Sequence, residues 1–421
     1  MKRFIQLKLK ILAKAILAKY KPEIIGITGS VGKTGAKEAV YAVLSPAFNA
    51  RKSVKNYNNE IGVPLTVIGE EAKGKSVFGW AGVFLKAIKL ILFKDERYPK
   101  ILIMEMGVDR PGDMKYLLSI VRPKTGIMTR IGESHLEFFD SVEEIRKEKE
   151  LLVKNLPESG FAILNYHDKR IRGVSGIKAK KITYSLDDKS DVQARNVNAA
   201  SLAGADFELF YNGTTVSARL PNAVGQPAVE AALAGAAAGV VYGISLEEIA
   251  KALNAYKPPK GRMNLIAGVK NTLIIDDTYN SSPESCVSAL ETVGKISLPD
   301  GKRKFAVLGD MLELGGFTEE GHRLVGKKVV ESGVNKLIAV GEKSRDIVRG
   351  AEEAGMKQDN IFHFPNADDA RIFVQERIKE GDLILIKGSQ GMRMEKIVKE
   401  IMAEPLRAEE LLVRQGEEWM K

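Results

Sequence analysis

The sequence predicts an α/β fold with mostly parallel sheets, and three observations lead to this class. Short apolar runs alternate with helical patterns along the 421 residues, which is the order that crossover helices between parallel strands produce. A glycine-rich turn at residues 26–34 separates the first apolar run from the first helical pattern. The length exceeds one ordinary hydrophobic core and indicates two or three domains.

The predicted strands are short runs rich in Ile, Leu and Val. They cover Glu23–Ile27, Ile101–Met106, Thr125–Thr129, Phe161–Leu164, Thr272–Ile275, Lys304–Leu308, Lys336–Val340 and Leu383–Ile386. Residues 182–220 alternate polar and apolar side chains and predict antiparallel strands. Helices are expected at Ala36–Leu44 and at the alanine-rich residues 228–242, and the charged tail from Ala403 is expected to be helical without a core stripe.

A proline pair gives the best domain boundary. Lys257-Pro-Pro-Lys-Gly261 ends a helical pattern, because proline cannot continue a helix and glycine favours a turn. We therefore expect a basic N-terminal helix at 1–22, a central domain at 23–259 and a C-terminal domain at 260–421.

Composition narrows the function classes. The net charge is +10, but no basic stripe with interleaved aromatics is visible, so nucleic-acid binding is not expected. Cys286 is the only cysteine, which fits a reducing compartment. No signal peptide is recognisable, and we expect a cytoplasmic monomer.

Much of the positive charge lies at the start of the chain. Residues 1–21 contain lysines, an arginine and interleaved apolar residues, with no acid before Glu23. This pattern predicts either a basic amphipathic helix at the inner face of an anionic membrane or a helix packed on the domain with its lysines in water. Residues 77–93 are also apolar, with Lys86 and Lys89 interrupting, and predict an amphipathic helix that is buried or touches lipid.

The glycine-rich turn carries the clearest chemistry. It reads Gly26-Ile-Thr-Gly-Ser-Val-Gly-Lys-Thr34 and lies between strand and helix, where backbone N–H groups can surround a phosphate. Lys33 can reach terminal phosphates, and the Thr34 hydroxyl can ligate Mg²⁺. The first glycine of the strict phosphate-loop pattern is replaced by Ile27.

Three further residues are candidates for a metal centre. Glu105 ends an apolar strand, and ligands in open α/β sheets bind beyond such strand ends. His135 follows the strand 125–129, and Lys149 lies in the charge run Arg146-Lys-Glu-Lys-Glu. The alternatives are a solvated carboxylate for Glu105, a structural role for His135 and a solvated helix face for Lys149.

Two loops are rich in polar side chains. Asn56-Tyr-Asn-Asn-Glu60 suits a polar substrate or an Asx-rich structural turn. Asp276 and Asp277 end a predicted strand ahead of Asn280 and Pro283. Acids in that position can bind a ribose, a cation or a helix N-terminus.

In combination these motifs resemble the ATP-dependent Mur ligases, from about Ile24 to about Val398. The resemblance covers Gly26–Thr34, Asn58–Leu65, Glu105–Gly107, the His135 segment, Gly261-Arg262, Asp276–Asn280, Leu308–Gly315 with His322, and Lys387–Gly391. It implies a P-loop-type central ATPase domain and a Rossmann-like C-terminal α/β domain. It also implies a ligase of peptidoglycan precursor synthesis that joins D-alanyl-D-alanine to a UDP-N-acetylmuramoyl-tripeptide through an acyl phosphate.

The resemblance further implies residue roles and cofactors. The cofactors would be ATP, two Mg²⁺ ions and a carbamylated Lys149. Lys33, Lys149 and His135 would be catalytic, and the metal ligands would be Thr34, Glu105, His135 and Lys149. ATP would bind Gly29, Ser30, Val31, Gly32, Lys33, Thr34, Arg262, Asp277 and Asn280. The UDP-muramoyl-peptide and dipeptide would meet Asn58, Asn59, Glu60, Asp310, Glu313 and Lys387.

Several positions depart from the family pattern. Only about twenty-five residues precede the phosphate loop, so we expect the uridine-nucleotide-binding domain to be missing. Gln226, Pro227 and Glu230 replace residues near adenine, which predicts an altered purine pocket. Gly35, Ser282 and Gln390 also differ from the pattern. None of these changes removes a predicted metal or phosphate ligand.

Two alternative functions stay open at this point. One is a Mur-like ligase acting on a lipid-linked or truncated acceptor, suggested by the missing domain and the basic N-terminal helix. The other is a non-catalytic nucleotide-binding subunit, which would be expected to have lost metal ligands, whereas Glu105, His135 and Lys149 are all present.

Overall fold

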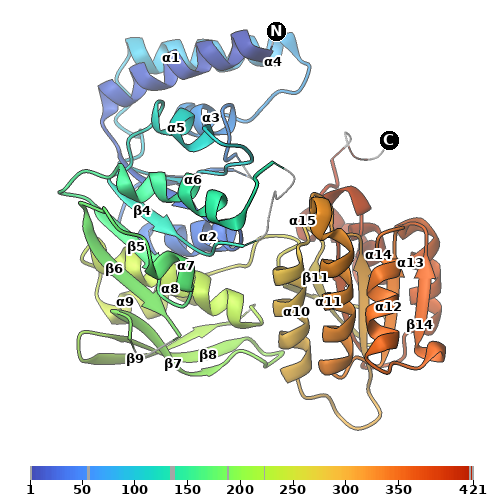
Figure 1. Cartoon of the computed structure of the whole chain (residues 1–421). Helices are drawn as coiled ribbons and strands as arrows, with labels where there is room; N and C mark the ends of the chain where they lie inside the picture. Colours follow the sequence, from blue (N-terminus) through green and yellow to red (C-terminus); the bar gives the residue numbers. More distant parts are fainter. Residues whose placement is uncertain are drawn as a thin grey trace.

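The computed structural model describes residues 2–54, 57–132, 138–186, 189–221, 223–416 and 419, without the side chains of residues 2–4. His135 therefore lies outside the described residues. The chain folds around two sheets that lie next to each other (Figure 1). No helix in the described part of the chain is long and apolar enough to cross a membrane.

The first sheet has nine strands in the order β2-β3-β1-β4-β5-β6-β7-β8-β9. Strands β2 to β7 are parallel, and β8 and β9 extend the sheet as an antiparallel meander. Their bounds are β1 Glu23–Thr28, β2 Ala50–Lys52, β3 Ile101–Glu105, β4 Thr125–Met128, β5 Phe161–Asn165, β6 Lys180–Ser185, β7 Val192–Asn198, β8 Ala205–Tyr211 and β9 Thr214–Leu220.

Alternate residues of the buried strands face two separate cores, as the two-residue period of a strand requires. Ile25 and Ile27 of β1 join a core with α2, α8 and α9, whereas Ile24 joins a core with α1, α3, α4 and α5. The helices are α1 Lys2–Tyr20, α2 Lys33–Leu44, α3 Gly62–Ile68, α4 Val77–Leu92, α5 Asp113–Leu118, α6 Val142–Lys154, α7 Lys169–Arg172, α8 Gln226–Val241 and α9 Leu246–Leu253. α8 packs closely against α2 because its alanines and glycines bring the two backbones together; a Cβ on Gly235 would lie 2.8 Å from the backbone of Ala39.

The second sheet has six strands in the order β10-β11-β15-β12-β13-β14 and is parallel except for β10. Its strands are β10 Asn264–Ala267, β11 Leu273–Asp277, β12 Lys304–Gly309, β13 Lys336–Val340, β14 Ile361–Phe364 and β15 Leu383–Lys387. Helices cover both faces: α10 Pro283–Lys295, α11 Thr318–Glu331, α12 Arg345–Glu353, α13 Ala367–Arg377, α14 Glu395–Ile401 and α15 Ala408–Leu411, with short 3₁₀ turns at 315–317, 358–360, 390–392 and 405–407.

Every strand predicted from an apolar run is present, and the mostly parallel α/β class is confirmed. Two details differ from expectation. Within 182–220, β6 runs parallel to β5 and β7, so only the β7-β8-β9 part is antiparallel. The tail from Ala403 contains one short helix, and Ala408 and Leu412 are buried against the second sheet, where their apolar side chains join a core.

The chain crosses between the sheets in residues 254–263, after α9 and before β10. This segment contains the proline pair, and the Arg262 N–H donates to the Pro259 carbonyl at 3.1 Å. Gly261 has φ +66° and lies against Tyr279, where a Cβ would be 3.0 Å from the Tyr279 nitrogen. The segment thus turns tightly and places Arg262 beside the ends of strands from both sheets.

Candidate active site

The loop between β1 and α2 has the conformation that an anion site requires. Gly29 and Gly32 have φ values of +149° and +90°, which residues with a Cβ rarely adopt. Gly32 caps α2 without any side-chain hydrogen bond to the helix, so the N–H groups of the first turn face the pocket. Thr129 holds the loop from β4, since its hydroxyl donates to the Val31 carbonyl at 2.6 Å.

Lys33 is the first residue of α2 and lies over the loop. Its Nζ donates to the carbonyls of Gly29 at 2.6 Å and Ser30 at 3.3 Å. Burial lowers the pKa of Lys33, while the Glu105 carboxylate partly opposes this shift. A partly buried ammonium beside the N–H groups of a helix N-terminus is suited to bind phosphate oxygens.

Glu105 lies where β3 ends, beside β1, and it is only 1% exposed. The Thr34 hydroxyl donates to its Oε2 at 3.2 Å, and the Lys37 ammonium lies 2.9 Å from its Oε1. A hydroxyl and a carboxylate are hard oxygen donors of the kind that Mg²⁺ prefers, so these two residues fit one Mg²⁺.

Lys149 lies on α6 and is buried, with 1% of its surface exposed. Burial lowers its pKa well below the ordinary value, and repulsion from Lys33 adds to the effect. The solvated alternatives for Glu105 and Lys149 are therefore wrong, because both side chains are enclosed. Among the described residues, no cluster of three His, Cys, Asp or Glu side chains is arranged around a metal position.

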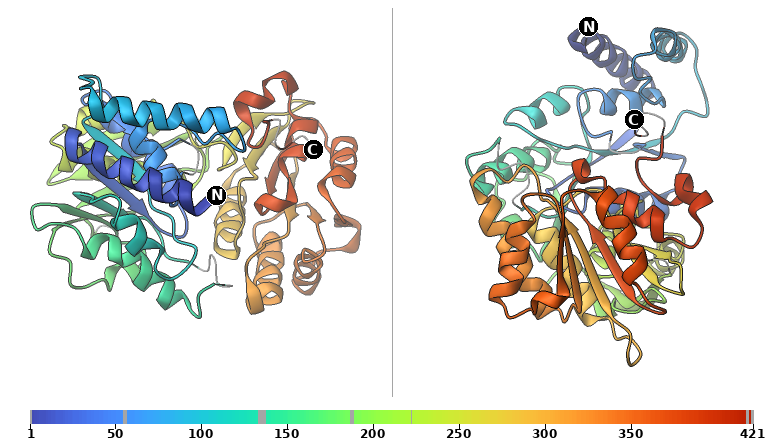
Figure 2. Two further views of the ribbon diagram at one scale, coloured as in Figure 1. Left: turned by 90° about the horizontal axis from the view of Figure 1, so that it is seen from above. Right: turned by 90° about the vertical axis from the view of Figure 1, so that its right-hand side faces the viewer.

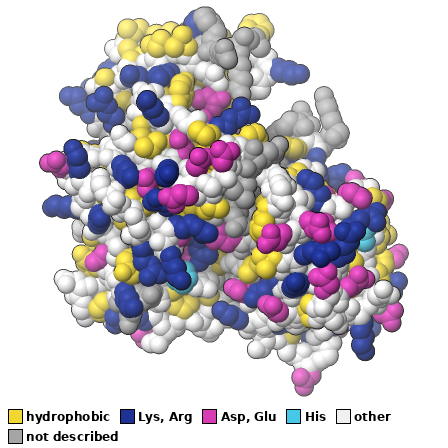
Figure 3. Space-filling view, viewed as in Figure 1, with side chains coloured by type: hydrophobic (Ala, Val, Ile, Leu, Met, Phe, Trp, Pro, Cys, Tyr) yellow, Lys and Arg dark blue, Asp and Glu magenta, His cyan; other side chains and the backbone are white. Residues whose placement is uncertain are grey.

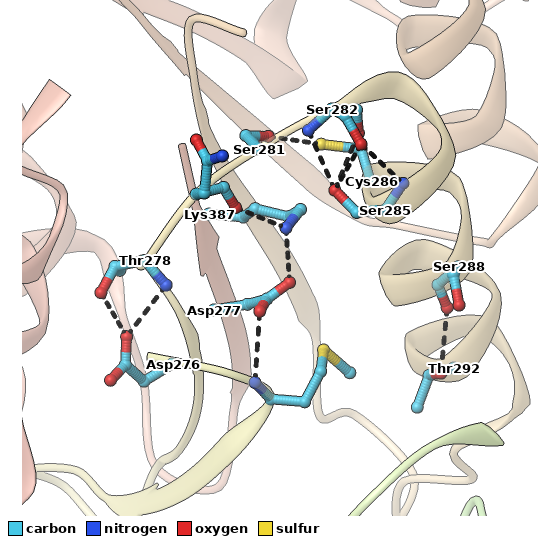
Figure 4. A network of polar contacts seen from close by, with 12 residues as sticks. Asp276, Asp277, Thr278, Ser281, Ser282, Ser285, Cys286, Ser288, Thr292 and Lys387 are labelled. Carbon is cyan, nitrogen blue, oxygen red and sulfur yellow. Dashed lines mark hydrogen bonds and ion pairs between the residues drawn. The ribbon is translucent and has the colours of Figure 1, made fainter. Parts of the chain in front are cut away.

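The second sheet contributes a buried ion pair at the ends of β11 and β15. Lys387 Nζ lies 2.6 Å from Asp277 Oδ2 and donates to the Asn280 carbonyl at 3.0 Å. The Met263 N–H donates to the other Asp277 oxygen at 3.3 Å. Figure 4 shows this pair, with the Ser282 and Ser285 cap that begins α10 beside it.

One pocket joins these two groups. It is lined by residues 30–36, from the phosphate loop and the first turn of α2, and by Arg262, Asp277 and Lys387 from across the linker. Arg262 stacks on Tyr279, with its guanidinium carbon 4.2 Å from the ring centroid. Hence a nucleotide in this pocket would contact both sheets.

Comparisons with known proteins agree with this geometry. Residues 85–239 match the model described as Mur ligase middle domain, and residues 261–390 match Mur ligase, glutamate ligase domain. The UDP-N-acetylmuramoyl-tripeptide–D-alanyl-D-alanine ligase of Bacillus subtilis (strain 168) is 31% identical over 395 residues, which are 94% of this chain and 79% of that protein. The chain belongs to the Mur ligase family.

Solved structures give the same result for the fold. MurF from Acinetobacter baumannii superimposes with a TM-score of 0.78 at 25% identity, covering 93% of this chain and 79% of that one. The MurF ligase from Thermotoga maritima in complex with ADP also superimposes with a TM-score of 0.78, at 24% identity. The match covers 94% of this chain and 83% of that one. The family and fold predicted from the motifs are confirmed.

The predictions for this Mur ligase missed Arg130, which follows β4 and lines the pocket. Its guanidinium donates to Glu230 of α8 at 2.5 Å and lies 3.7 Å from Glu284 of α10. Gly132 lets Glu284 approach, since a Cβ there would be 1.9 Å from the carboxylate oxygen. Arg130 thus bridges the two sheets. The sequence predicts an altered purine pocket at Glu230, but it does not show that Arg130 is the ion-pair partner of this residue.

The Mur ligase loop around residue 58 is partly structural. Asn59 Oδ1 accepts from the N–H groups of Ile61 and Gly62 at 3.2 and 3.0 Å, which makes the Asx turn that begins α3. Glu60 accepts from Gln6 of α1 at 2.7 Å. Asn58 packs on Gly107, two residues after Glu105 at the end of β3. The substrate roles of all three residues stay predictions.

Asp310 and Glu313 lie in the loop after β12, and neither residue lines the pocket at the phosphate loop. Asp310 accepts from the Ser344 N–H at 2.7 Å, and Glu313 is exposed with φ +63°. His322 orders this loop: the Met311 N–H donates to its Nε2 at 3.0 Å, and its Nδ1 lies 2.6 Å from the Thr318 carbonyl. Burial lowers the pKa of His322, which fits a neutral ring with its proton on Nδ1. The side chain of Asn280 is exposed, and its contact with Lys387 is through the backbone.

Proposed function

We propose that this Mur ligase joins D-alanyl-D-alanine to the terminal carboxylate of a UDP-N-acetylmuramoyl-tripeptide, with ATP converted to ADP and phosphate. The observation that carries the proposal is the pocket shared by Lys33 and Thr34 on one side and Arg262, Asp277 and Lys387 on the other. The named relatives supply the substrates, since the Bacillus subtilis protein is a tripeptide–D-alanyl-D-alanine ligase.

The reaction needs two anions, ATP and a carboxylate, to approach each other. A carboxylate oxygen attacks the γ-phosphorus, and ADP leaves with the electrons of the broken bond. The dipeptide amine then attacks the acyl carbon, loses a proton and expels phosphate. Lys33 and the N–H groups of α2 would hold the phosphates, where positive charge stabilises the transferring group. Gly29, Ser30, Val31, Gly32 and Thr34 form the rest of this cradle.

Mg²⁺ fits the oxygen donors of Thr34 and Glu105, and when bound it would supply charge that reduces the repulsion between the phosphates and the carboxylate. A second ion, with His135 and a carbamylated Lys149 as its supports, is part of the proposal. Carbamylation requires a neutral amine: the Nζ lone pair forms a bond to CO₂, and a proton leaves to solvent. Burial favours that neutral form at Lys149.

The remaining roles are also proposed. Arg262, Asp277 and Asn280 would contact ATP from the second sheet, while Asn58, Asn59, Glu60, Asp310, Glu313 and Lys387 would contact the two peptide substrates. The domain division at 1–22, 23–259 and 260–421 is part of the proposal. The two separate sheets and the linker between them support its boundary at 259/260, whereas α1 shares a core with the first sheet. Because the pocket is lined from both sides, closure of the two parts would complete it.

A coupled assay tests the proposal. ADP and phosphate should be released only when a UDP-muramoyl-tripeptide and a D-alanyl-D-alanine dipeptide are both present, and Lys33→Met should abolish release. A panel of UDP-muramoyl-peptides and dipeptides fixes the specificity. Release that needs neither substrate would reject a ligase, and nucleotide binding without any release would favour a non-catalytic subunit.

We further propose a monomer in the cytoplasm that contacts the inner face of the membrane through residues 1–21. Leu7 and Ile11 of α1 are exposed among lysines, which supports this contact. The same observation favours a second candidate function, a ligase for a lipid-linked acceptor. Replacing the UDP-linked tripeptide with a lipid-linked one in the assay distinguishes the two acceptors.

A further inference from the structure

Helices α1 and α4 lie next to each other at one end of the molecule (Figures 1 and 2). Side chains at the end of α1 fix the end of α4. Lys19 Nζ donates to the carbonyl of Ile91 at 2.9 Å, and the Tyr20 hydroxyl lies 3.1 Å from the carbonyl oxygens of both Leu90 and Phe93, either of which can accept its proton. These hydrogen bonds join the two helices although their sequences are more than fifty residues apart.

The inner faces of both helices are part of the core. Leu9, Ala13 and Ile16 of α1 are fully buried, as are Val83 and Ala87 of α4. The prediction that residues 1–21 pack on the domain is thus correct for one face of the helix. It also means that deleting these residues would expose the core, so deletion is a poor test of any surface role.

The outer faces are apolar to an unusual degree. Phe78 is 91% exposed, and the other side chains of this surface range from 44% to 76%. We call the surface the α1–α4 platform; it consists of Leu7, Ile11, Val77, Phe78, Leu85, Ile88, Leu92 and Phe93. Isolated exposed apolar residues are normal, but a contiguous group marks an interaction surface. Figure 3 shows hydrophobic side chains gathered at this end of the molecule.

The two helices of the platform carry charge of one sign, and the acidic Glu70 lies beside α4, where it pairs with Lys86. Residues 1–22 and 72–93 contain no Asp or Glu, and Lys8, Lys14, Lys75 and Lys89 are exposed. A second copy of the chain would bring these lysines against lysines, which opposes a symmetric dimer through this face. An apolar strip flanked by lysines instead complements a surface with anionic groups above a hydrocarbon layer.

We propose that the α1–α4 platform docks in the plane of an anionic phospholipid bilayer, with Phe78, Leu85 and Leu92 entering the acyl boundary and the lysines at the headgroups. This inference deepens the proposed membrane contact of residues 1–21 by assigning the larger apolar share to α4. It does not depend on the ligase reaction, so a binding experiment and an activity assay can fail separately.

Vesicle flotation of the full chain tests the platform. Wild-type protein should float with vesicles of phosphatidylglycerol and phosphatidylcholine and not with phosphatidylcholine alone, and 0.5 M salt should weaken the binding, since salt at that concentration screens surface charge. The variant Phe78→Gln/Leu92→Gln should lower the partition coefficient at least about tenfold, because it removes apolar area from the inserted face. Lys14→Gln/Lys89→Gln should lower it by roughly fivefold per lysine.

A matched control uses apolar residues exposed elsewhere. Leu324→Gln/Ile372→Gln changes apolar side chains that are 47% and 43% exposed on α11 and α13 and should leave flotation unchanged. Circular dichroism and thermal unfolding verify that each variant is folded. Flotation that is equal for the wild type and the platform variants would overturn the proposal. So would concentration-dependent dimerisation that only the platform variants lose, because it would assign the surface to a second copy.

Discussion

The ammonium of Lys37 lies 2.9 Å from Oε1 of Glu105, and both side chains are buried. Lys37 is one turn along α2 from Thr34, which donates to the other carboxylate oxygen. The charge of Glu105 is thus balanced from within the protein by the helix that carries the phosphate loop. This relationship couples the stability of the first sheet to the residues that would hold Mg²⁺.

The variant Lys37→Met should lower the free energy of unfolding by about 3–5 kcal/mol, because it leaves a buried carboxylate without its partner. Urea unfolding measures this change. Lys251→Met, an exposed lysine on α9, is the control and should have little effect. The double variant Lys37→Met/Glu105→Gln should lose less unfolding free energy than the two single variants lose in sum. Losses that add strictly would contradict a direct interaction between the two side chains.

Much of this arrangement could be predicted from the sequence because it depends on local patterns. The apolar run before Glu105 and the glycines before Lys33 each specify a strand end or a turn, and parallel strands bring those ends to one edge. The contact of Arg130 with Glu284 could not be predicted, since it depends on how two sheets meet across a linker. The burial of Lys149 was equally hidden, because a run of Arg, Lys and Glu normally indicates a solvated helix face.

Stability should also depend on pH through Asp276. This residue is fully buried, and burial raises its pKa from the ordinary 3.8 to about 6. The folded state then binds the proton more tightly than the unfolded chain, so the stabilisation from protonated Asp276 is complete below about pH 4 and is lost as pH rises through about 6.

Asp276→Asn should remove this dependence, because the amide keeps an oxygen to accept from the Thr278 N–H and hydroxyl. We expect the variant to match the wild type near pH 4 and to exceed its stability at pH 7.5 by about 2–3 kcal/mol. Urea unfolding from pH 4 to 7.5 tests this, with exposed Asp300→Asn as the control. A constant difference between Asp276→Asn and the wild type at every pH would be evidence against the titration of Asp276.

The bridge made by Arg130 should affect nucleotide binding. Glu284→Gln removes the charge that draws α10 toward Arg130 at the pocket, while Arg130 keeps Glu230. We expect the KM for ATP to rise about two- to fivefold with kcat nearly unchanged, since a partly exposed ion pair contributes modestly. Glu291→Gln, on the same helix but paired with Lys328, is the control. A fall in kcat at constant KM would indicate a different role for Glu284.

The modification proposed for Lys149 makes a chemical prediction as well as a kinetic one. Burial lowers the pKa of this amine well below its ordinary value, so the neutral form that reacts with CO₂ is favoured over that of an exposed lysine, and lowering the pH should protonate the amine and release the carbamate. Wild-type protein incubated with ¹³C-bicarbonate should show a carbamate resonance that Lys149→Ala lacks.

The Lys149→Ala variant should lose at least about a hundredfold in kcat, consistent with loss of a positioned charge. The control Lys147→Ala changes an exposed residue on the same helix and should keep full activity. Added bicarbonate should not rescue Lys149→Ala, but a short carboxylic acid should restore part of its rate, because it supplies a carboxylate in the space that the lysine leaves. Full activity of Lys149→Ala would show that no carbamate acts in this site.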